Sequence, residues 1–201
     1  MRSIPSPCLA AITDRTLLSP NWTLAQAIAP AVTGGVNFVI FREDELPSSA
    51  RLTLCAFARD GVRGRAPLVT SGSPEFTSDA GAEGIHLEDD SSITAARARV
   101  GPDCYVGVTI RRPEHARAAA SGGADYGLAI LDWSYPDRAL KLLLSICSGI
   151  SLPIIAGVDM RVESVADCMR AGAAGAAICS PVMEAYDRTA AAKSYWDALQ
   201  G

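Results

Sequence analysis

The feature that most constrains this chain is an alternation, repeated eight times, of a short apolar run with a longer helix-like stretch. The apolar runs contain few polar residues, which is typical of parallel strands buried on both faces. Strands and helices in this order predict an α/β fold, and eight such units are the number that closes a barrel. The expected strands are 8–13, 37–42, 67–71, 84–88, 104–110, 124–130, 152–158 and 175–180.

Glycines mark the ends of several expected helices. Gly34, Gly81, Gly122 and Gly172 precede every second strand, at places where a helix C-terminus favours a positive φ. This spacing of about two strand–helix units is typical of a barrel with an internal repeat. We therefore predict a (β/α)8 TIM barrel in one domain over residues 1–201, with an open doubly wound sheet as the alternative. The expected helices lie near 23–33, 48–60, 75–81, 91–100, 112–121, 136–148, 161–171 and 182–199.

The charge and the composition of the chain indicate which classes of partner are not expected. The formal net charge is −4 and the sequence pI about 5.2, so no broad basic surface is expected and neither nucleic acid nor an anionic membrane is an expected partner. No uninterrupted apolar run approaches the roughly 18 residues of a membrane span. The six cysteines form no CxxC pair and lie in apolar segments, which indicates reduced, buried thiols and a cytoplasmic protein.

The candidate site lies at one end of the predicted barrel. In such barrels the chemistry takes place at the carboxyl ends of the strands, on the loops that lead into the helices. Arginines and carboxylates together at this mouth indicate a site for an anionic ligand; a solvated rim of ion pairs is the alternative. The polar residues that follow the expected strands include Asp14, Arg15, Arg42, Glu43, Asp44, Ser71, His86, Glu88, Asp89, Asp90, Thr109, Arg111, Arg112, Asp132, Asp159, Cys179 and Ser180.

Five segments, in order and spread over nearly the whole chain, resemble the family of thiamine phosphate synthase and the thiazole tautomerase TenI. The resemblance implies a TIM barrel that joins an aminopyrimidine pyrophosphate to a thiazole phosphate and releases pyrophosphate. It also implies Mg²⁺ as cofactor, because charge builds up on the leaving pyrophosphate. The segments are AITDR at 11–15, GVNFVIFREDEL at 35–46, GAEGIHLEDD at 81–90, the stretch 106–130 and the stretch 152–185.

The resemblance assigns ligand contacts to four positions. Arg42 matches the arginine of the family's LREK motif, on the pyrophosphate side, and is a candidate for both binding and catalysis. Cys179 and Ser180 stand where the family offers backbone N–H groups to the thiazole phosphate, a contact that tolerates side-chain change. Gly157 belongs to the segment AGVDM, which matches the family's IGGI phosphate loop.

Three further positions are candidate catalytic residues. Thr109 stands where the family has a serine at the end of the fifth strand, and Arg111 stands where the tautomerase has its acid/base histidine. Arginine does not exchange its proton near neutral pH, so Arg111 cannot act in the same way. His86 is the histidine expected near the mouth; a hydrogen-bonded structural histidine is the alternative there.

The chain also departs from the family pattern. The lysine of the LREK motif is Asp44, and the Asn-Asp pair that helps to hold Mg²⁺ is Ser71-Gly72. Asp159 replaces a glycine of the phosphate loop, where its carboxylate would repel a phosphate dianion unless it is neutralised. Asp89 and Asp90 are the remaining candidate ligands for a metal. These losses predict weak or absent synthase turnover.

The leading hypothesis is therefore a thiamine-related transferase or isomerase that binds a small phosphorylated heterocycle of the thiazole phosphate type. One alternative is a divergent barrel without this catalysis that binds a ligand or a partner. Another is a phosphate-binding barrel of a different pathway, such as a sugar-phosphate isomerase. The sequence leaves open whether the chain forms a homo-oligomer.

Overall fold

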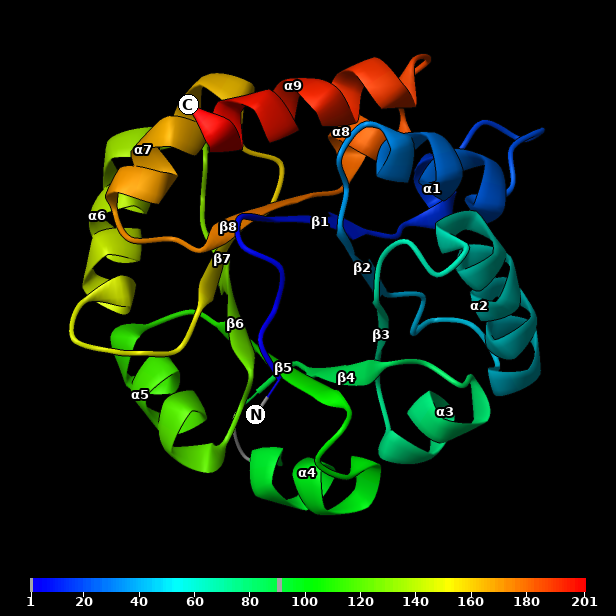
Figure 1. Cartoon of the computed structure of the whole chain (residues 1–201), viewed down its shortest axis with the longest axis horizontal. Coiled ribbons are helices and arrows are strands. Elements are labelled where there is room, and N and C mark those ends of the chain that lie inside the picture. The colour runs from blue at the N-terminus through cyan, green and yellow to red at the C-terminus, as the bar shows by residue number, and fades with distance from the viewer. Residues whose placement is uncertain (1, 90–91) are drawn as a thin grey trace.

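A closed barrel of eight parallel strands forms the centre of the computed structural model, which describes residues 2–89 and 92–201 (Figure 1). Each strand pairs with the next, and the pairing of Cys8 with Gly175 closes the ring between the first and last strands. The predicted (β/α)8 barrel is confirmed, and this closure excludes the open sheet. The strands are β1 (Cys8–Ile12), β2 (Phe38–Phe41), β3 (Leu68–Ser71), β4 (Gly84–Leu87), β5 (Tyr105–Ile110), β6 (Tyr126–Ile130), β7 (Ile154–Gly157) and β8 (Gly175–Ile178).

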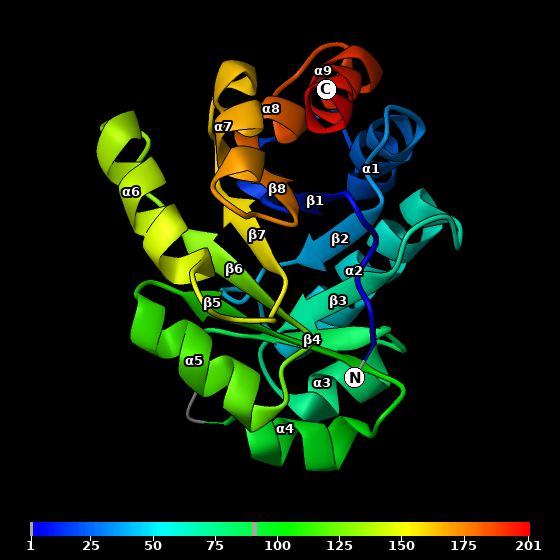
Figure 2. The same ribbon diagram turned by 60° about the vertical axis from the view of Figure 1, so that its left-hand side comes forward.

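Helices surround the barrel on its outside (Figure 2). The helix expected at 161–171 is a 3₁₀ turn, Val162–Ser164, followed by α7. The helix expected at 182–199 is two helices, because the Asp187 side chain accepts a hydrogen bond from Ala190 N at 2.9 Å and begins a new one. The helices are α1 (Leu24–Thr33), α2 (Ser48–Val62), α3 (Pro74–Asp79), α4 (Ile93–Val100), α5 (Pro113–Gly122), α6 (Pro136–Cys147), α7 (Val165–Arg170), α8 (Ser180–Met183) and α9 (Arg188–Gln200).

The glycine prediction holds at two of its four positions. Gly81 and Gly172 have φ values of 58° and 98°, as expected at helix ends. Gly34 instead has φ −80° and Gly122 is the last residue of α5; the positive φ belongs to the following glycine in each pair. The sequence does not reveal which of two adjacent glycines ends the helix.

The strands bury side chains on both faces. Along β1, Cys8, Ala10 and Ile12 point into the barrel, while Leu9 and Ala11 pack among the helices. The interior cluster also contains Tyr126 of β6, which is fully buried and makes an edge contact with Phe38 at 5.2 Å between ring centroids. The barrel interior is therefore a packed core rather than a channel.

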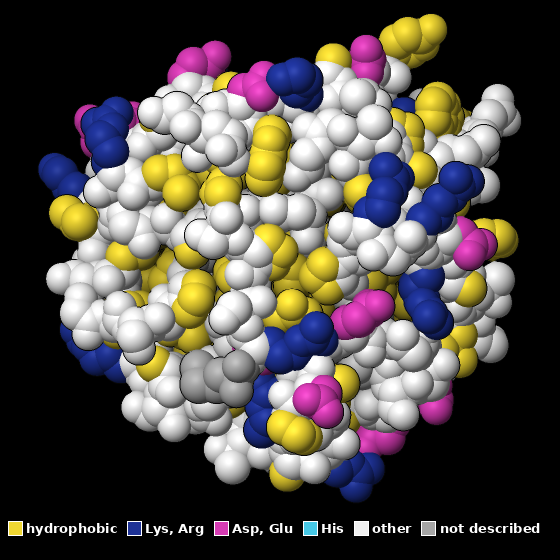
Figure 3. All heavy atoms as spheres, in the orientation of Figure 1, with side chains coloured by type: hydrophobic (Ala, Val, Ile, Leu, Met, Phe, Trp, Pro, Cys, Tyr) yellow, Lys and Arg dark blue, Asp and Glu magenta, His cyan; other side chains and the backbone are white. Residues whose placement is uncertain are grey.

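Residues 2–7, which precede β1, cover the end of the barrel at which the strands begin (Figure 2). Arg2 donates its backbone N–H to Asp125 Oδ1 at 2.7 Å, and its guanidinium lies 4.2 Å from the centroid of the Tyr105 ring. Figure 3 shows this face, where hydrophobic side chains are visible across the middle and most charged side chains lie nearer the periphery. The opposite end, where the strands finish, remains as the mouth.

Two further properties bear on the surroundings of the protein. In the described part of the chain, no helix has the length and apolar character needed to cross a membrane. All six cysteines are free, and burial raises the pKa of the Cys8 thiol to about 12.

Candidate functional site

A cavity of about 670 Å³ opens at the mouth of the barrel. Its wall comes from the segments that follow β1, β2, β4, β7 and β8, which the closed ring brings to one end. Of the described residues that line it, Arg42 is basic and six are acidic: Asp14, Glu43, Asp44, Glu45, Glu88 and Asp159. The cavity therefore combines a single arginine with a wall that is otherwise rich in negative charge.

The Asp159 carboxylate binds the groups that the sequence analysis assigned to a phosphate. Its Oδ1 accepts the backbone N–H groups of Cys179 at 3.1 Å and Ser180 at 3.0 Å, and its Oδ2 accepts the Ser180 hydroxyl at 2.9 Å. Asp159 has φ 59°, a left-handed conformation that aspartate tolerates better than most residues. A carboxylate of the protein itself thus accepts hydrogen bonds from all three donors.

Acidic groups surround this part of the cavity. Glu43 is 1% exposed and accepts the backbone N–H of Arg15 at 3.0 Å; burial raises the pKa of its carboxyl group. Burial, together with the negative charges of Asp159 and Asp14, raises the pKa of the Cys179 thiol to about 12. Cys179 is therefore a neutral thiol near pH 7 and is poorly suited to act as a nucleophile.

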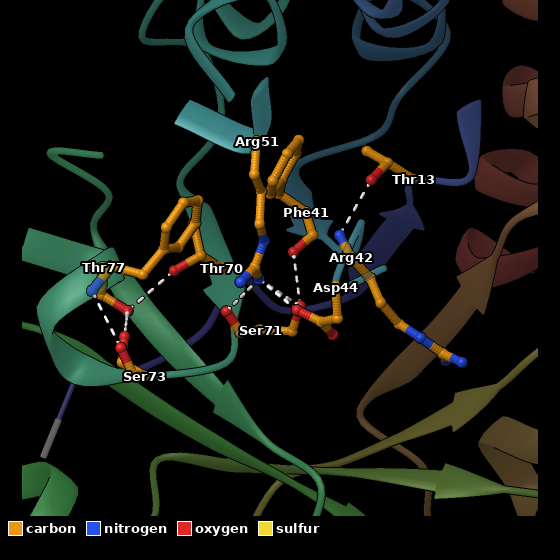
Figure 4. Close-up of polar contacts among 10 residues, drawn as sticks. Thr13, Phe41, Arg42, Asp44, Arg51, Thr70, Ser71, Ser73 and Thr77 are labelled. Atoms are coloured by element: carbon orange, nitrogen blue, oxygen red, sulfur yellow. Dashed lines mark hydrogen bonds and ion pairs between the residues drawn. The ribbon is translucent and has the colours of Figure 1, made fainter. Parts of the chain in front are cut away.

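Arg42 presents its guanidinium to the cavity. Its backbone N–H is held by the Thr13 hydroxyl at 3.0 Å, while its exposed side chain extends away from the neighbouring polar cluster (Figure 4). Within residues 2–89 and 92–201, the guanidinium has no hydrogen-bond or ion-pair partner. It is therefore free to bind an anionic group of a ligand.

Beside Arg42, a second arginine is bound within the protein through its guanidinium Nη2, although its buried Nε has no hydrogen-bond partner in the described chain. Arg51 of α2 donates from Nη2 to the Ser71 carbonyl at 2.6 Å and to the Ser71 hydroxyl at 3.1 Å, and it forms an ion pair with Asp44 (Figure 4). The Ser71 hydroxyl in turn donates to Asp44 Oδ1 at 2.8 Å. The Arg51 guanidinium also lies 3.9 Å from the centroid of the Phe76 ring, so it is held from several sides.

These residues do not fit the Mg²⁺ that the resemblance implies. Gly72 offers no carboxylate, a Cβ on it would lie 2.9 Å from Arg51 Nη1, and the nearby Asp44 carboxylate is neutralised by the same guanidinium. Over the described ranges, no three His, Cys, Asp or Glu side chains are grouped so that they could hold a metal ion. Of the two candidate ligands, Asp89 interacts with other groups of the protein, and Asp90 lies outside the described residues.

His86 and Thr109 lie below the cavity, inside the barrel, and neither lines it. His86 is 2% exposed; its Nδ1 is 3.0 Å from the Tyr126 hydroxyl and its Nε2 is 3.1 Å from Thr109 Oγ1. Burial, with a smaller effect from the charge of Arg42, lowers the pKa of His86 to about 3. This geometry favours the structural alternative for His86, and the catalytic roles of His86 and Thr109 stay predictions.

The remaining predicted site residues have other contacts. Arg111 is exposed and donates to the Glu88 carbonyl at 3.3 Å and to its carboxylate at 3.4 Å. Gly157 is buried at the end of β7, where its carbonyl accepts Leu131 N at 3.2 Å and Trp133 Nε1 at 3.3 Å. Of the residues to which the resemblance gives a role, Arg42 and Cys179 line the cavity directly. Several other polar candidates of the mouth also line it: Asp14, Glu43, Asp44, Glu88 and Asp159.

The sequence analysis missed Arg51. A signal was present, because Arg51, Cys55, Ala58 and Val62 recur at helical spacing and all four are buried on one face of α2. An arginine at the start of such an apolar stripe indicates a cation that points inward, towards the sheet.

The chain is similar in sequence and in fold to known proteins. The family model described as thiamine monophosphate synthase matches residues 9–182. The chain is 36% identical over 177 residues to a thiamine-phosphate synthase of Anaeromyxobacter dehalogenans, covering 84% of this chain and 79% of that protein. It is 31% identical over 196 residues to the thiamine-phosphate synthase of Nitrosococcus oceani, covering 93% and 90%. The solved structure of thiamine phosphate pyrophosphorylase from Pyrococcus furiosus superposes with a TM-score of 0.83 at 23% identity, covering 96% of this chain and 95% of that one.

Proposed function

Because this chain belongs to the thiamine monophosphate synthase family, we propose that its mouth binds a phosphorylated heterocycle of the kind this family uses, with the anionic group held by Arg42. The observation that carries the proposal is the guanidinium of Arg42, which faces a cavity of about 670 Å³ with no partner in the described chain. Guanidinium groups bind phosphate oxygens by charge-assisted, often bidentate hydrogen bonds. The pyrophosphate of an aminopyrimidine is the group that the resemblance assigns to this position.

We also propose that the synthase reaction itself is weak or absent in this chain. Release of pyrophosphate needs cations beside the leaving group, because negative charge builds up on it. Each such contact stabilises the transition state by about 2–4 kcal/mol. The motif lysine is Asp44 here, and Arg51 is held by Asp44 and Ser71 rather than left free for a ligand. Arg42 alone supplies little of the charge compensation that the reaction needs.

The second candidate function is a barrel that binds its ligand, or a protein partner, without catalysis. Internal contacts at the rim favour it: Arg111 pairs with Glu88, and Arg51 pairs with Asp44. The two functions differ in whether a bound heterocycle is turned over.

Calorimetric titration with pyrophosphate, and then with the aminopyrimidine pyrophosphate, tests the proposal. We expect Arg42→Ala to weaken both affinities at least about tenfold, a loss of roughly 1.4 kcal/mol. The matched control is Arg138→Ala, which removes an exposed arginine on α6, outside the cavity. Equal affinities for the parent and the Arg42→Ala variant would contradict the proposal, as would the absence of binding at millimolar concentration.

A further inference from the structure

The two ends of the cavity differ in charge and in what they have left to offer a ligand. The end formed by β2 presents Arg42, whose guanidinium has no ion-pair partner in the described chain. Its acidic neighbours Asp44 and Glu45 are paired with Arg51 and Arg15. The end formed by the segments after β7 and β8 presents Asp159, an exposed carboxylate. An anionic ligand group is therefore attracted to the first end and meets a like charge at the second.

The donors at the second end are already used. Cys179 N, Ser180 N and the Ser180 hydroxyl all point at Asp159, at 2.9 to 3.1 Å. A phosphate could take these donors only if the carboxylate left them, and it would then face that carboxylate at short range. Three satisfied donors with a fixed negative charge do not make a receptor for a second anion.

No nearby cation forms an ion pair with Asp159 in the described chain. The Asp14 carboxylate is held by Thr16, through its hydroxyl at 2.5 Å and its backbone N–H at 2.9 Å. Arg161, the cation closest in sequence to Asp159, is exposed and forms no ion pair with it in the described chain. Arg15 forms an ion pair with Glu45 at 3.0 Å and lies 4.0 Å from Glu43. The negative charge of Asp159 is therefore available to the ligand.

Asp159 still has capacity to accept a hydrogen bond. A carboxylate offers about four acceptor sites, and three of them are used here: two at Oδ1 and one at Oδ2. The remaining site at Oδ2 suits a hydroxyl or amino group, which donates a hydrogen and carries no negative charge.

We propose that Asp159 is a specificity-determining residue: the end of the cavity formed after β7 and β8 takes the hydroxyl or amino group of an unphosphorylated heterocycle and rejects its phosphate ester. This inference rests on the proposed function, in which Arg42 binds the anionic partner at the other end. The ligand pair is then one phosphorylated heterocycle and one heterocycle with a free alcohol or amine.

The test separates the two ends of the cavity by calorimetry. The parent protein is first titrated with pyrophosphate to occupy Arg42, and that step alone reports on the proposed function. It is then titrated with the thiazole phosphate and, separately, with the thiazole alcohol that lacks the phosphate. We expect the alcohol to bind at least about tenfold more tightly than the phosphate, a difference of roughly 1.4 kcal/mol.

The variant Asp159→Asn removes the charge, keeps an oxygen that can accept from Cys179 N and Ser180 N, and tolerates the left-handed backbone. We expect it to lose the preference for the alcohol. Asp60→Asn, which makes the same change in net charge on an exposed residue of α2 away from the cavity, should keep the preference.

Binding of the thiazole phosphate by the parent as tightly as the alcohol would overturn the inference, even when pyrophosphate binds as proposed. An unchanged preference in a folded Asp159→Asn variant would do the same. Failure of pyrophosphate to bind would count against the proposed function alone, because the comparison of alcohol with phosphate still reports on Asp159. If the variant does not fold, the preference of the parent decides.

Discussion

The guanidinium of Arg51 lies directly over Gly72, so close that a Cβ on this glycine would stand 2.9 Å from Nη1 and 3.2 Å from Nη2. The glycine also has φ +96°, a conformation that side chains rarely adopt. Arg51 thus lies where the resemblance implies the aspartate that follows the family's asparagine. The guanidinium of Arg51, from α2, occupies the space beside the end of β3 that a carboxylate side chain at position 72 would need.

This contact predicts how a substitution at the glycine affects stability. Gly72→Ala should destabilise the fold by more than the roughly 1 kcal/mol of an ordinary positive-φ glycine, because Arg51 must also move. Gly64→Ala is the matched control, since Gly64 has φ +69° and nothing within 4 Å of its Cβ position. Urea unfolding of both variants gives the difference. Equal losses would show that Arg51 gives way without cost.

A second prediction concerns Gly107 and Tyr126 inside the barrel. A Cβ on Gly107 of β5 would lie 2.0 Å from Cζ of the ring of Tyr126, its partner on β6, which is fully buried in the barrel interior. Gly107→Ala should therefore cost about 3 kcal/mol or more in unfolding free energy, at the upper end of overpacking effects. Adding Tyr126→Val should recover part of the loss, since the two changes share one space. Strict additivity in urea unfolding would contradict the contact.

A third prediction concerns acid stability. His86 has a folded-state pKa of about 3 against 6.5 in the unfolded chain, so below pH 6.5 the unfolded state binds the extra proton. Its contribution to stability is complete above pH 6.5 and declines as the pH falls towards 3. Between pH 7 and pH 5 the loss is about 2 kcal/mol, at 1.36 kcal/mol per pKa unit.

His86→Gln should remove most of this loss while keeping polar contacts to Tyr126 and Thr109. The raised pKa of Glu43 acts in the opposite direction: its contribution falls as the pH rises through its titration range, so it does not mimic the effect of His86. Urea midpoints at pH 7 and pH 5 measure both proteins. The same pH dependence in parent and variant would show that His86 does not carry it.

The fourth prediction concerns turnover. With both heterocyclic substrates of the family and Mg²⁺ present, we expect thiamine phosphate formation to be weak or undetectable. The loss of several transition-state contacts at about 2–4 kcal/mol each removes many powers of ten in rate, even allowing for non-additivity. A curated relative such as the Anaeromyxobacter dehalogenans synthase is the positive control for the assay. Robust product formation by this chain would disprove the prediction.

Much of the fold could be predicted from the sequence alone, because its signals are local. The run CLAAI is apolar at every position, as a strand buried on both faces requires, and it forms β1 as expected. The helix expected at 182–199 passed over Asp187, a local helix-start signal whose side chain caps α9 and separates it from α8. It placed the site at the ends of the strands through the general rule for barrels, and Arg42 and Cys179 do lie in the cavity wall there.

The sequence by itself thus determined the barrel, its order of elements and the end at which polar residues gather. Only the tertiary structure decided which of those residues bind one another. Asp159 binds Ser180 across 21 positions, Arg51 reaches Ser71 across 20, and His86 bonds to Tyr126 across 40. The physical reason is that apolar periodicity is a property of neighbouring residues in the sequence. A hydrogen bond between distant residues instead depends on distances of about 3 Å, which exist only once the ring of strands has closed.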